Sequence, residues 1–280
     1  MATVWSAVFV TEFILILTIN AFTIIAFVRK CHLRKRSTYL IINLTVADLL
    51  VGAVTGPLDR YASDIKAESE YGFSWRAFVV VTLTYIFSGT SLSYLSLISL
   101  ERLHATLYPF RHCLIGKRVY FTIIICCWSL ALLLSSLFSV LHMFVKAAIP
   151  YLLASYIVLT ILTLTVSYVI IIVKVRNNPA PYHFSSVASD RKLSITLFIV
   201  TVASILTILP WAIFLNFPLD SRNQLLPEAN ALLVLYYTSS LVNPLIYAVR
   251  MQQFRKAVKE IIFCKETPDS SRVHPMELPM

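Results

Sequence analysis

The sequence SYLSLISLERLHATLYPFRH, residues 93–112, passes from an apolar run into two adjacent charges, Glu101 and Arg102. Pro109 then follows in a basic loop. A full charge at the middle of a bilayer is expensive, so charged pairs in membrane proteins are normally confined to helix ends or functional sites. The stretch therefore predicts a membrane-spanning helix whose cytoplasmic end carries a partnered Glu–Arg pair.

The composition of the whole chain indicates a polytopic helical membrane protein. Of its 280 residues, 58% are hydrophobic and 14% are charged, whereas soluble domains have about 25% charged residues. Seven apolar segments are long enough to cross a hydrocarbon core of roughly 30 Å. They are residues 4–28, 39–58, 76–100, 119–141, 149–173, 193–215 and 230–249. The predicted fold class is all-α, a seven-transmembrane helix bundle with a short amphipathic eighth helix over residues 250–264.

The distribution of charge predicts the orientation of the chain and no nucleic-acid partner. The net charge is +10, and most Lys and Arg residues fall in alternate connections and in the C-terminal segment. The positive-inside rule places these segments in the cytoplasm, with the N-terminus extracellular and the C-terminus cytoplasmic. The basic residues of the amphipathic helix would face anionic membrane lipids. One domain over residues 1–265 and a short cytoplasmic tail over residues 266–280 are expected.

The positions of the cysteines predict that there is no extracellular disulfide. Cys31, Cys113 and Cys264 fall on the predicted cytoplasmic side, and Cys126 and Cys127 fall inside a membrane helix. Stable disulfides belong to the oxidising side of the membrane. Cys264 ends the amphipathic helix and is a candidate palmitoylation site, with a free cytosolic thiol as the alternative.

Taken together, the polar motifs resemble those of rhodopsin-like (class A) G-protein-coupled receptors. Glu101-Arg102-Leu103 is similar to the family's Asp/Glu-Arg-Tyr segment, with Leu103 in place of the usual Tyr. Asn243-Pro244-Leu245-Ile246-Tyr247 matches the family's Asn-Pro-x-x-Tyr motif. Further matching positions are Asn20, Asn43, Asp48, Trp128 and Pro210. The resemblance implies a non-enzymatic plasma-membrane receptor that binds an extracellular ligand and activates a heterotrimeric G protein, with arrestin as a further candidate partner.

The resemblance also implies an activation role for one set of residues. Arg102 would pair with Glu101 at rest and contact the G protein after the sixth apolar segment, residues 193–215, moves outward about Pro210. Tyr168 and Tyr247 match tyrosines that support this arginine on activation, and interfacial aromatic anchors are the alternative. The residues predicted for G-protein coupling and activation are Glu101, Arg102, Tyr168, Pro210, Asn243, Pro244 and Tyr247.

Asp48 is the acidic residue deep in the second apolar segment. Intramembrane carboxylates tend to face the interior of a bundle or a water-filled cavity, and in the resembling family the matching Asp binds sodium. Its expected neighbours are Ser91, Ser239 and Asn243, which supply the oxygen ligands that hard cations prefer. A protonated Asp48 hydrogen-bonded in the core is the alternative, and no other cofactor is expected.

A ligand pocket is expected to open outward from the middle of the third apolar segment, residues 76–100. Thr84 stands where amine receptors of the family carry Asp, so a cationic amine would lack its counter-ion. Segment 230–249 contains no lysine for a retinal Schiff base. Aromatic surface and hydroxyls suit a neutral or lipophilic small molecule, while an acidic loop at 59–70 could steer a cationic peptide. The predicted pocket residues, with plain helix packing as the alternative, are Thr84, Tyr85, Ser88, Trp211, Leu215, Leu233, Tyr236 and Tyr237.

Besides Leu103, three positions depart from the family pattern. Ala77 stands where the family usually has a cysteine, in the third apolar segment. The proline usual in the fifth segment is replaced near Thr160, and Ile208 replaces the aromatic residue before Pro210. A missing disulfide and a proline-free helix 5 occur together in melanocortin-like receptors, so the resemblance points to an orphan-like branch near the melanocortin, cannabinoid and adenosine receptor groups. Two alternatives stay open, a receptor-like protein that binds ligand without G-protein signalling and a transporter.

Overall fold

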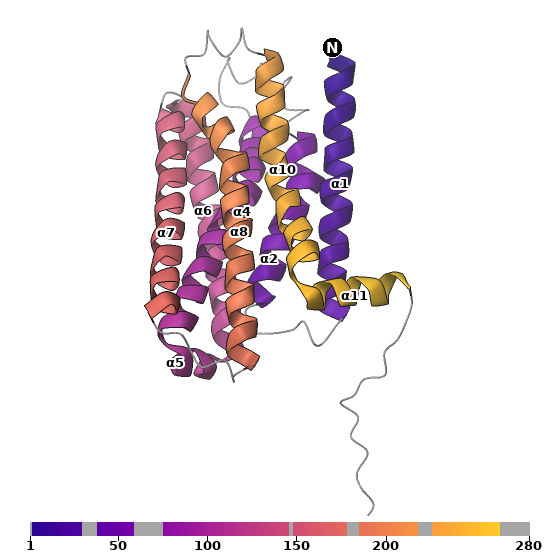
Figure 1. The fold of residues 1–280 in the computed structure, drawn as a ribbon. Coiled ribbons are helices and arrows are strands. Elements are labelled where there is room, and N and C mark those ends of the chain that lie inside the picture. Colours follow the sequence, from indigo (N-terminus) through magenta and orange to yellow (C-terminus); the bar gives the residue numbers. More distant parts are fainter. Residues whose placement is uncertain are drawn as a thin grey trace, which may run out of the picture.

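The computed structural model describes residues 2–29, 38–58, 75–145, 148–177, 185–217 and 226–263. These residues form a helical bundle, and seven of its helices are long and apolar enough to cross a membrane (Figure 1). The predicted fold class, an all-α seven-transmembrane bundle, is therefore confirmed. The acidic loop at 59–70 and the candidate lipidation site Cys264 lie outside the described residues.

The spanning helices are α1 (Ala2–Arg29), α2 (Thr38–Leu50), α4 (Trp75–Leu107), α6 (Lys117–Phe144), α7 (Ile149–Asn177), α8 (Ser185–Phe214) and α10 (Leu226–Arg250). The second span continues beyond α2 through a π-helical turn, η2 (Val51–Thr55). Two shorter helices are α5 (Pro109–Leu114) and α11 (Gln252–Ile262). Helices α5 and α11 lie at one end of the bundle, here called the α11 end, and the N-terminus lies at the opposite end, here called the N-terminal end (Figure 1).

Helices α4 and α8 extend well beyond the predicted apolar segments. Helix α8 begins at Ser185, and α4 continues to Leu107, so Glu101 and Arg102 lie inside a helix and not at its end as predicted. The chain leaves α4 at Tyr108, because the residue before a proline is disfavoured in the helical region. Pro109 then opens α5, since a proline at the first position of a helix removes no intrahelical hydrogen bond.

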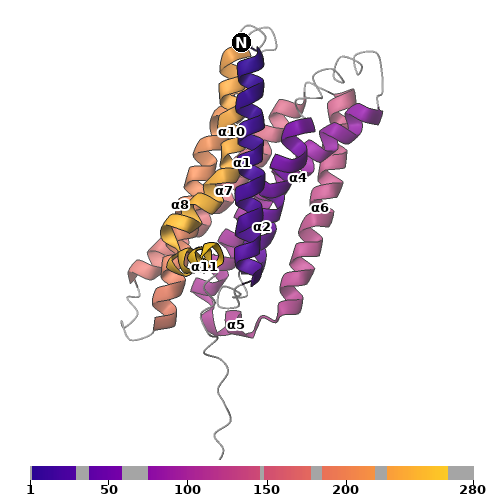
Figure 2. The ribbon, with the colours of Figure 1, turned by 90° about the vertical axis from the view of Figure 1, so that its right-hand side faces the viewer.

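Helix α11 is the expected amphipathic helix, although it begins at Gln252 and Arg250 belongs to α10. It runs across the bundle axis in Figure 1, and Figure 2 views it end-on. Phe254 and Ala257 are buried against the bundle, whereas Lys256 and Lys259 are exposed. This arrangement is typical of a helix that lies in the membrane interface, with its apolar side inward and its cationic side toward lipid headgroups.

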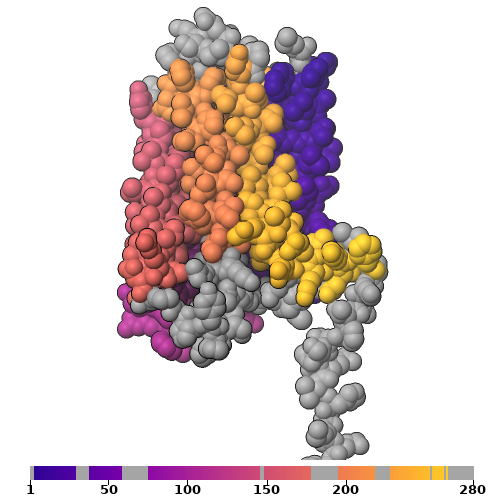
Figure 3. Space-filling view, in the orientation of Figure 1, coloured from indigo at the N-terminus to yellow at the C-terminus, as the bar shows by residue number. Residues whose placement is uncertain are grey.

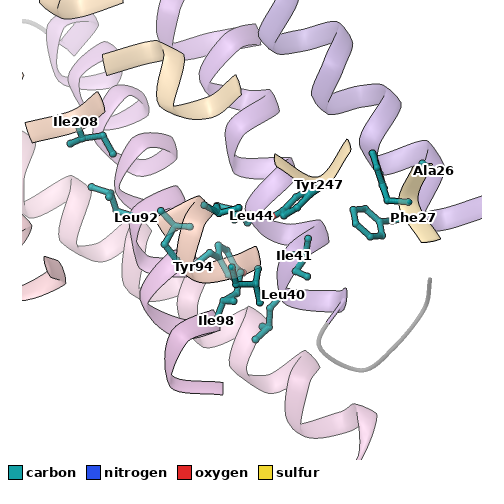
Figure 4. Close-up of a cluster of buried hydrophobic side chains, with 14 of the residues drawn as sticks. Ala26, Phe27, Leu40, Ile41, Leu44, Leu92, Tyr94, Ile98, Ile208 and Tyr247 are labelled. Carbon is teal, nitrogen blue, oxygen red and sulfur yellow. The ribbon is translucent and has the colours of Figure 1, made fainter. Parts of the chain in front are cut away.

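The largest cluster of buried hydrophobic side chains joins all seven spanning helices and α11. Figure 4 shows Leu44 of α2 between Leu92 of α4 and Tyr247 of α10. Phe27 of α1 packs edge-on against Tyr247, with ring centroids 6.1 Å apart. Lipid tails are as apolar as these side chains, so the helices associate through close packing and internal hydrogen bonds more than through exclusion of water.

Hydrogen bonds from side chains join α6 to α2 and α7 to α4. Trp128 Nε1 of α6 donates to Asn43 Oδ1 of α2 over 3.2 Å. The Tyr156 hydroxyl of α7 donates to the Gly89 carbonyl of α4 over 2.8 Å. Helix α7 is continuous through Thr160, where the family has proline. The Tyr156 bond therefore joins α7 to α4 within a turn of the position where the proline is missing.

Gly52 in η2 allows the second span to approach α1 closely. A Cβ atom at this position would lie 2.6 Å from Ile16 Cγ2 and 3.2 Å from the backbone nitrogen of Leu17. A Cβ atom on Gly89 of α4, in contrast, would meet nothing within 4 Å. We therefore expect Gly52→Ala to lower the free energy of unfolding by about 1–3 kcal/mol through overpacking.

Thermal unfolding in detergent measures this effect, with Gly89→Ala as the matched control. The control variant is expected to be neutral or to gain up to about 1 kcal/mol, because Ala is the better helix former. Equal unfolding temperatures for the two variants would contradict the close contact between η2 and α1.

Candidate functional site

The Glu101–Arg102 pair forms the first polar group of the candidate site. Arg102 is 3% exposed although it lies toward the α11 end of α4. Its Nε atom donates to Glu101 Oε2 over 2.5 Å, and its Nη2 atom donates to Glu101 Oε1 over 2.7 Å. A bidentate, charge-assisted pair of this kind is among the strongest side-chain interactions. The predicted resting partner of Arg102 is therefore in place.

Two residues from other helices also hold the Glu101 carboxylate. The Tyr120 hydroxyl of α6 donates to Glu101 Oε1 over 3.0 Å. His112 Nε2 of α5 lies 3.2 Å from the same oxygen. Neither residue was predicted, because each is distant from Glu101 in sequence and no local spacing connects them. The resting pair is thus anchored from α4, α5 and α6 together.

The two predicted activation tyrosines, Tyr168 and Tyr247, are buried against aromatic rings of other helices. Tyr168 of α7 lies edge-on to Phe198 of α8 at 5.0 Å. Tyr247 of α10, fully buried, packs against Phe27 of α1 and Phe254 of α11. A movement of either tyrosine toward Arg102 would have to break its ring contact, so these contacts oppose such a movement.

Asp48, the second polar group, is fully buried at the centre of the bundle. Ser91 Oγ donates to its Oδ1 atom over 2.7 Å, and Asn243 Nδ2 donates to its Oδ2 atom over 2.5 Å. The Ser240 side chain also hydrogen-bonds to the carboxylate. Ser91 and Asn243 are therefore the neighbours that the sequence predicted, whereas Ser240 was missed in favour of the adjacent Ser239.

A small cavity adjoins the partners of Asp48. Its volume is about 20 Å³, and four serines supply its polar lining: Ser88, Ser91, Ser239 and Ser240. A cavity of about 10–15 Å³ or more is large enough to hold one water molecule. Ser88 Oγ and Asn243 Oδ1 are buried without a hydrogen-bond partner among the described residues. Oxygen atoms with free acceptor capacity beside a carboxylate fit a hard monovalent cation or a water molecule.

The same cavity brings together part of the predicted ligand pocket. Ser88, Tyr236 and Tyr237 line it. The Trp211 ring lies 6.4 Å from that of Tyr236, and Leu233 belongs to the buried cluster that contains Tyr237. Five of the eight predicted pocket residues are therefore neighbours between α4, α8 and α10.

The other three predicted pocket residues do not reach this cavity. Thr84 Oγ1 donates to the Val80 carbonyl of its own helix. Tyr85 turns toward α6, where its ring lies 5.7 Å from that of Phe138. Leu215 lies in the turn beyond α8. The helical position of Tyr85 directs its side chain to the α4–α6 interface, which the motif spacing alone did not reveal.

The geometry defines the class of protein as a seven-helix membrane bundle. Its polar groups are a buried Glu–Arg pair near one end and an Asn-Pro-x-x-Tyr segment beside a buried Asp. The family model of the 7 transmembrane receptor (rhodopsin family) matches residues 19–148. This part of the chain is therefore similar to the rhodopsin-like family, as the motifs predicted. The matching family consists of receptors and not of enzymes.

Two curated relatives share part of the sequence. The Histamine H4 receptor of Homo sapiens is 32% identical over 120 residues, which cover 41% of this chain and 30% of the relative. Dopamine receptor 2 of Drosophila melanogaster is 32% identical over 93 residues, which cover 33% of this chain and 17% of the relative. The matched segments thus span less than a third of either relative. Neither name belongs to the melanocortin, cannabinoid or adenosine groups, so that placement stays a prediction.

Proposed function

We propose that this chain is a plasma-membrane receptor that binds an extracellular ligand toward its N-terminal end and activates a heterotrimeric G protein at its α11 end. The observation that carries the proposal is the buried Arg102, which is held by Glu101 near an end of the bundle where a partner could reach it. A charge buried in this way is stable only while it is paired, so loss of the pair favours exposure of the arginine.

The proposed orientation follows from the charges of the described helix ends. Cationic residues concentrate at the α11 end, whereas Arg76 is the cation at the N-terminal end of the described helices. Those at the α11 end include Arg29, Arg111, Lys117, Arg118, Lys174, Arg176, Arg250, Arg255, Lys256 and Lys259. The positive-inside rule then assigns this end to the cytoplasm, where a G protein, or arrestin as a second partner, would bind.

Helix α8 contains the structural feature that would allow the change of state. Pro210 lies inside this helix, so one intrahelical hydrogen bond is missing there and the helix can bend at that point. Phe198 lies on the same helix and contacts Tyr168. An outward swing of the α11-end half of α8 would separate these rings and free Tyr168 to approach Arg102. A ligand that favours this conformation shifts the equilibrium toward it.

The proposed ligand is a neutral or lipophilic small molecule, or a peptide. A cationic amine is not proposed for the cavity between α4, α8 and α10. The names of the two relatives point to histamine and dopamine. In this chain, however, no carboxylate lines the cavity between α4, α8 and α10 within the described residues, and Thr84 offers only a hydroxyl. A buried ammonium without a counter-ion is strongly disfavoured. Because the cavity is about 20 Å³, α8 and α10 would have to separate to admit a ligand.

Basal G-protein activation in cells tests the proposal, with the native chain compared with Arg102→Ala at equal surface expression. We expect Arg102→Ala to reduce basal activation to the level of cells without the receptor, since the contact to the G protein is lost. Arg76→Ala is the matched control, because it removes an exposed arginine at the opposite end. Native activation that persists unchanged in Arg102→Ala would contradict the proposal.

A further inference from the structure

Glu12 is a buried carboxylate that the receptor mechanism does not use. It lies ten residues into α1, roughly 15 Å along the helix from Ala2. Glu12 is 6% exposed and faces α10, where the Thr238 hydroxyl lies 3.0 Å from Glu12 Oε1. Helices α1 and α10 lie side by side on the surface of the bundle (Figures 1 and 3).

The hydrogen bonds of this carboxylate are incomplete. Thr238 has a single hydroxyl proton, and its oxygen also lies 2.9 Å from the Val234 carbonyl, which competes for that proton. Glu12 Oε2 is buried and has no hydrogen-bond partner among the described residues. A carboxylate can accept about four hydrogen bonds, so most of its capacity is unused. An ionised group in hydrocarbon without a partner is costly, so ionisation of Glu12 requires a partner that carries a positive charge.

Glu12, although largely buried, is among the residues that line a shallow groove between the two helices. The groove has a volume of about 710 Å³, and Thr3, Ala7 and Thr11 of α1 line it with Val234 and Thr238 of α10. Glu12 is the only charged group among its lining residues, all of which the structure describes. The lining between Thr3 and Glu12 runs for roughly 14 Å along α1 at 1.5 Å per residue. The groove is therefore long and mostly apolar, with one acid among its lining residues.

We propose that this groove is a binding site for a lipophilic amine, with the ammonium group on Glu12 and the apolar body along α1 and α10. Charge complementarity carries this assignment, because no basic side chain of the groove neutralises Glu12. A neutral amine can enter from the bilayer and accept the carboxyl proton of Glu12 on its nitrogen, which leaves a carboxylate–ammonium pair. Such a pair is strong in a medium of low dielectric constant. The site is separate from the cavity beside Asp48 and does not depend on G-protein activation.

Photolabelling of the purified chain in phosphatidylcholine nanodiscs tests the site, with a diazirine derivative of dodecylamine as the probe. We expect labels on α1 and α10 peptides that unlabelled dodecylamine removes and dodecanol removes at least tenfold less well. Glu12→Gln should lower this competable labelling at least tenfold, because the amide keeps the shape and loses the charge. Glu228→Gln, which removes an exposed carboxylate of α10, should leave the labelling unchanged.

A second variant separates loss of the site from loss of the fold. Ala7 is exposed on α1 and lines the groove, so Ala7→Trp fills the groove while Glu12 is kept. We expect the same loss of labelling, with a thermal unfolding temperature close to that of the native chain. Equal labelling of native chain and Glu12→Gln would overturn the proposal. Equal competition by dodecanol would also overturn it and would assign the groove to hydroxyl-bearing or purely apolar lipids.

Discussion

The Glu101→Gln variant is expected to raise basal G-protein activation roughly tenfold over the native chain. Hydrogen bonds to a charged group contribute about 1.5–3 kcal/mol, and each 1.4 kcal/mol changes an equilibrium about tenfold. The amide keeps the shape of the side chain but removes the negative charge that both Arg102 contacts use. The resting state then contains a buried, poorly compensated arginine, so the equilibrium shifts toward the state that exposes it.

Nucleotide exchange on the G protein in cell membranes measures this effect at equal receptor amounts. Tyr120→Phe removes one hydrogen bond to Glu101 and should raise activation by a smaller factor. Glu228→Gln is the charge-matched control at the N-terminal end and should not differ from the native chain. A Glu101→Gln variant that folds and is no more active than the native chain would show that the pair does not restrain the resting state.

The Asp48→Asn variant is expected to abolish stabilisation by sodium. We infer that a sodium ion binds the buried carboxylate beside Ser91, Ser240 and Asn243. Two of these partners, Ser91 and Ser240, line a small cavity that could hold the ion. A ligand present at a hundred times its dissociation constant stabilises the folded state by about 2.7 kcal/mol. Replacement of choline chloride by sodium chloride at constant ionic strength should therefore raise the unfolding temperature of the native chain.

The amide introduced by Asp48→Asn would retain the shape of the side chain and lose the charge that attracts the cation. The sodium-specific shift should vanish in Asp48→Asn and shrink in Ser91→Ala, while Glu228→Gln keeps the native shift. If the native chain shows no difference between sodium and choline, Asp48 is a core acid satisfied by its three side-chain partners. A full shift in Asp48→Asn would exclude this carboxylate as the sodium site.

The sequence predicted the spans and the residues of local motifs because both depend on short-range patterns. Apolar length identified the helices, and the order of Asp48, Arg102 and Asn243 along the chain was enough to place them on the inner side of the bundle. The end of α4 was not predicted correctly, because the hydropathy of the sequence falls at Glu101. The helix itself continues to Leu107, and Pro109 prevents its further extension.

Contacts between distant segments could not be predicted in the same way. Thr238 meets Glu12 across a separation of 226 residues, and no local pattern relates them. His112 and Tyr120 meet Glu101 only because α5 folds back beneath α4 and α6 returns beside it. Tyr85 faces Phe138 and not the cavity because its direction depends on how α4 is rotated against α6. Each of these facts depends on helix rotation and register, which apolar spacing leaves undetermined.

The most direct test of the receptor assignment is nucleotide exchange on purified heterotrimeric G proteins by the purified chain in nanodiscs. Glu101→Gln is compared with the double variant Glu101→Gln/Arg102→Ala and with empty nanodiscs. We predict that Glu101→Gln accelerates exchange on at least one G-protein class and that the added Arg102→Ala change returns the rate to that of empty nanodiscs. Exchange at the empty-nanodisc rate for folded Glu101→Gln with every class, or exchange that survives Arg102→Ala, would contradict the account.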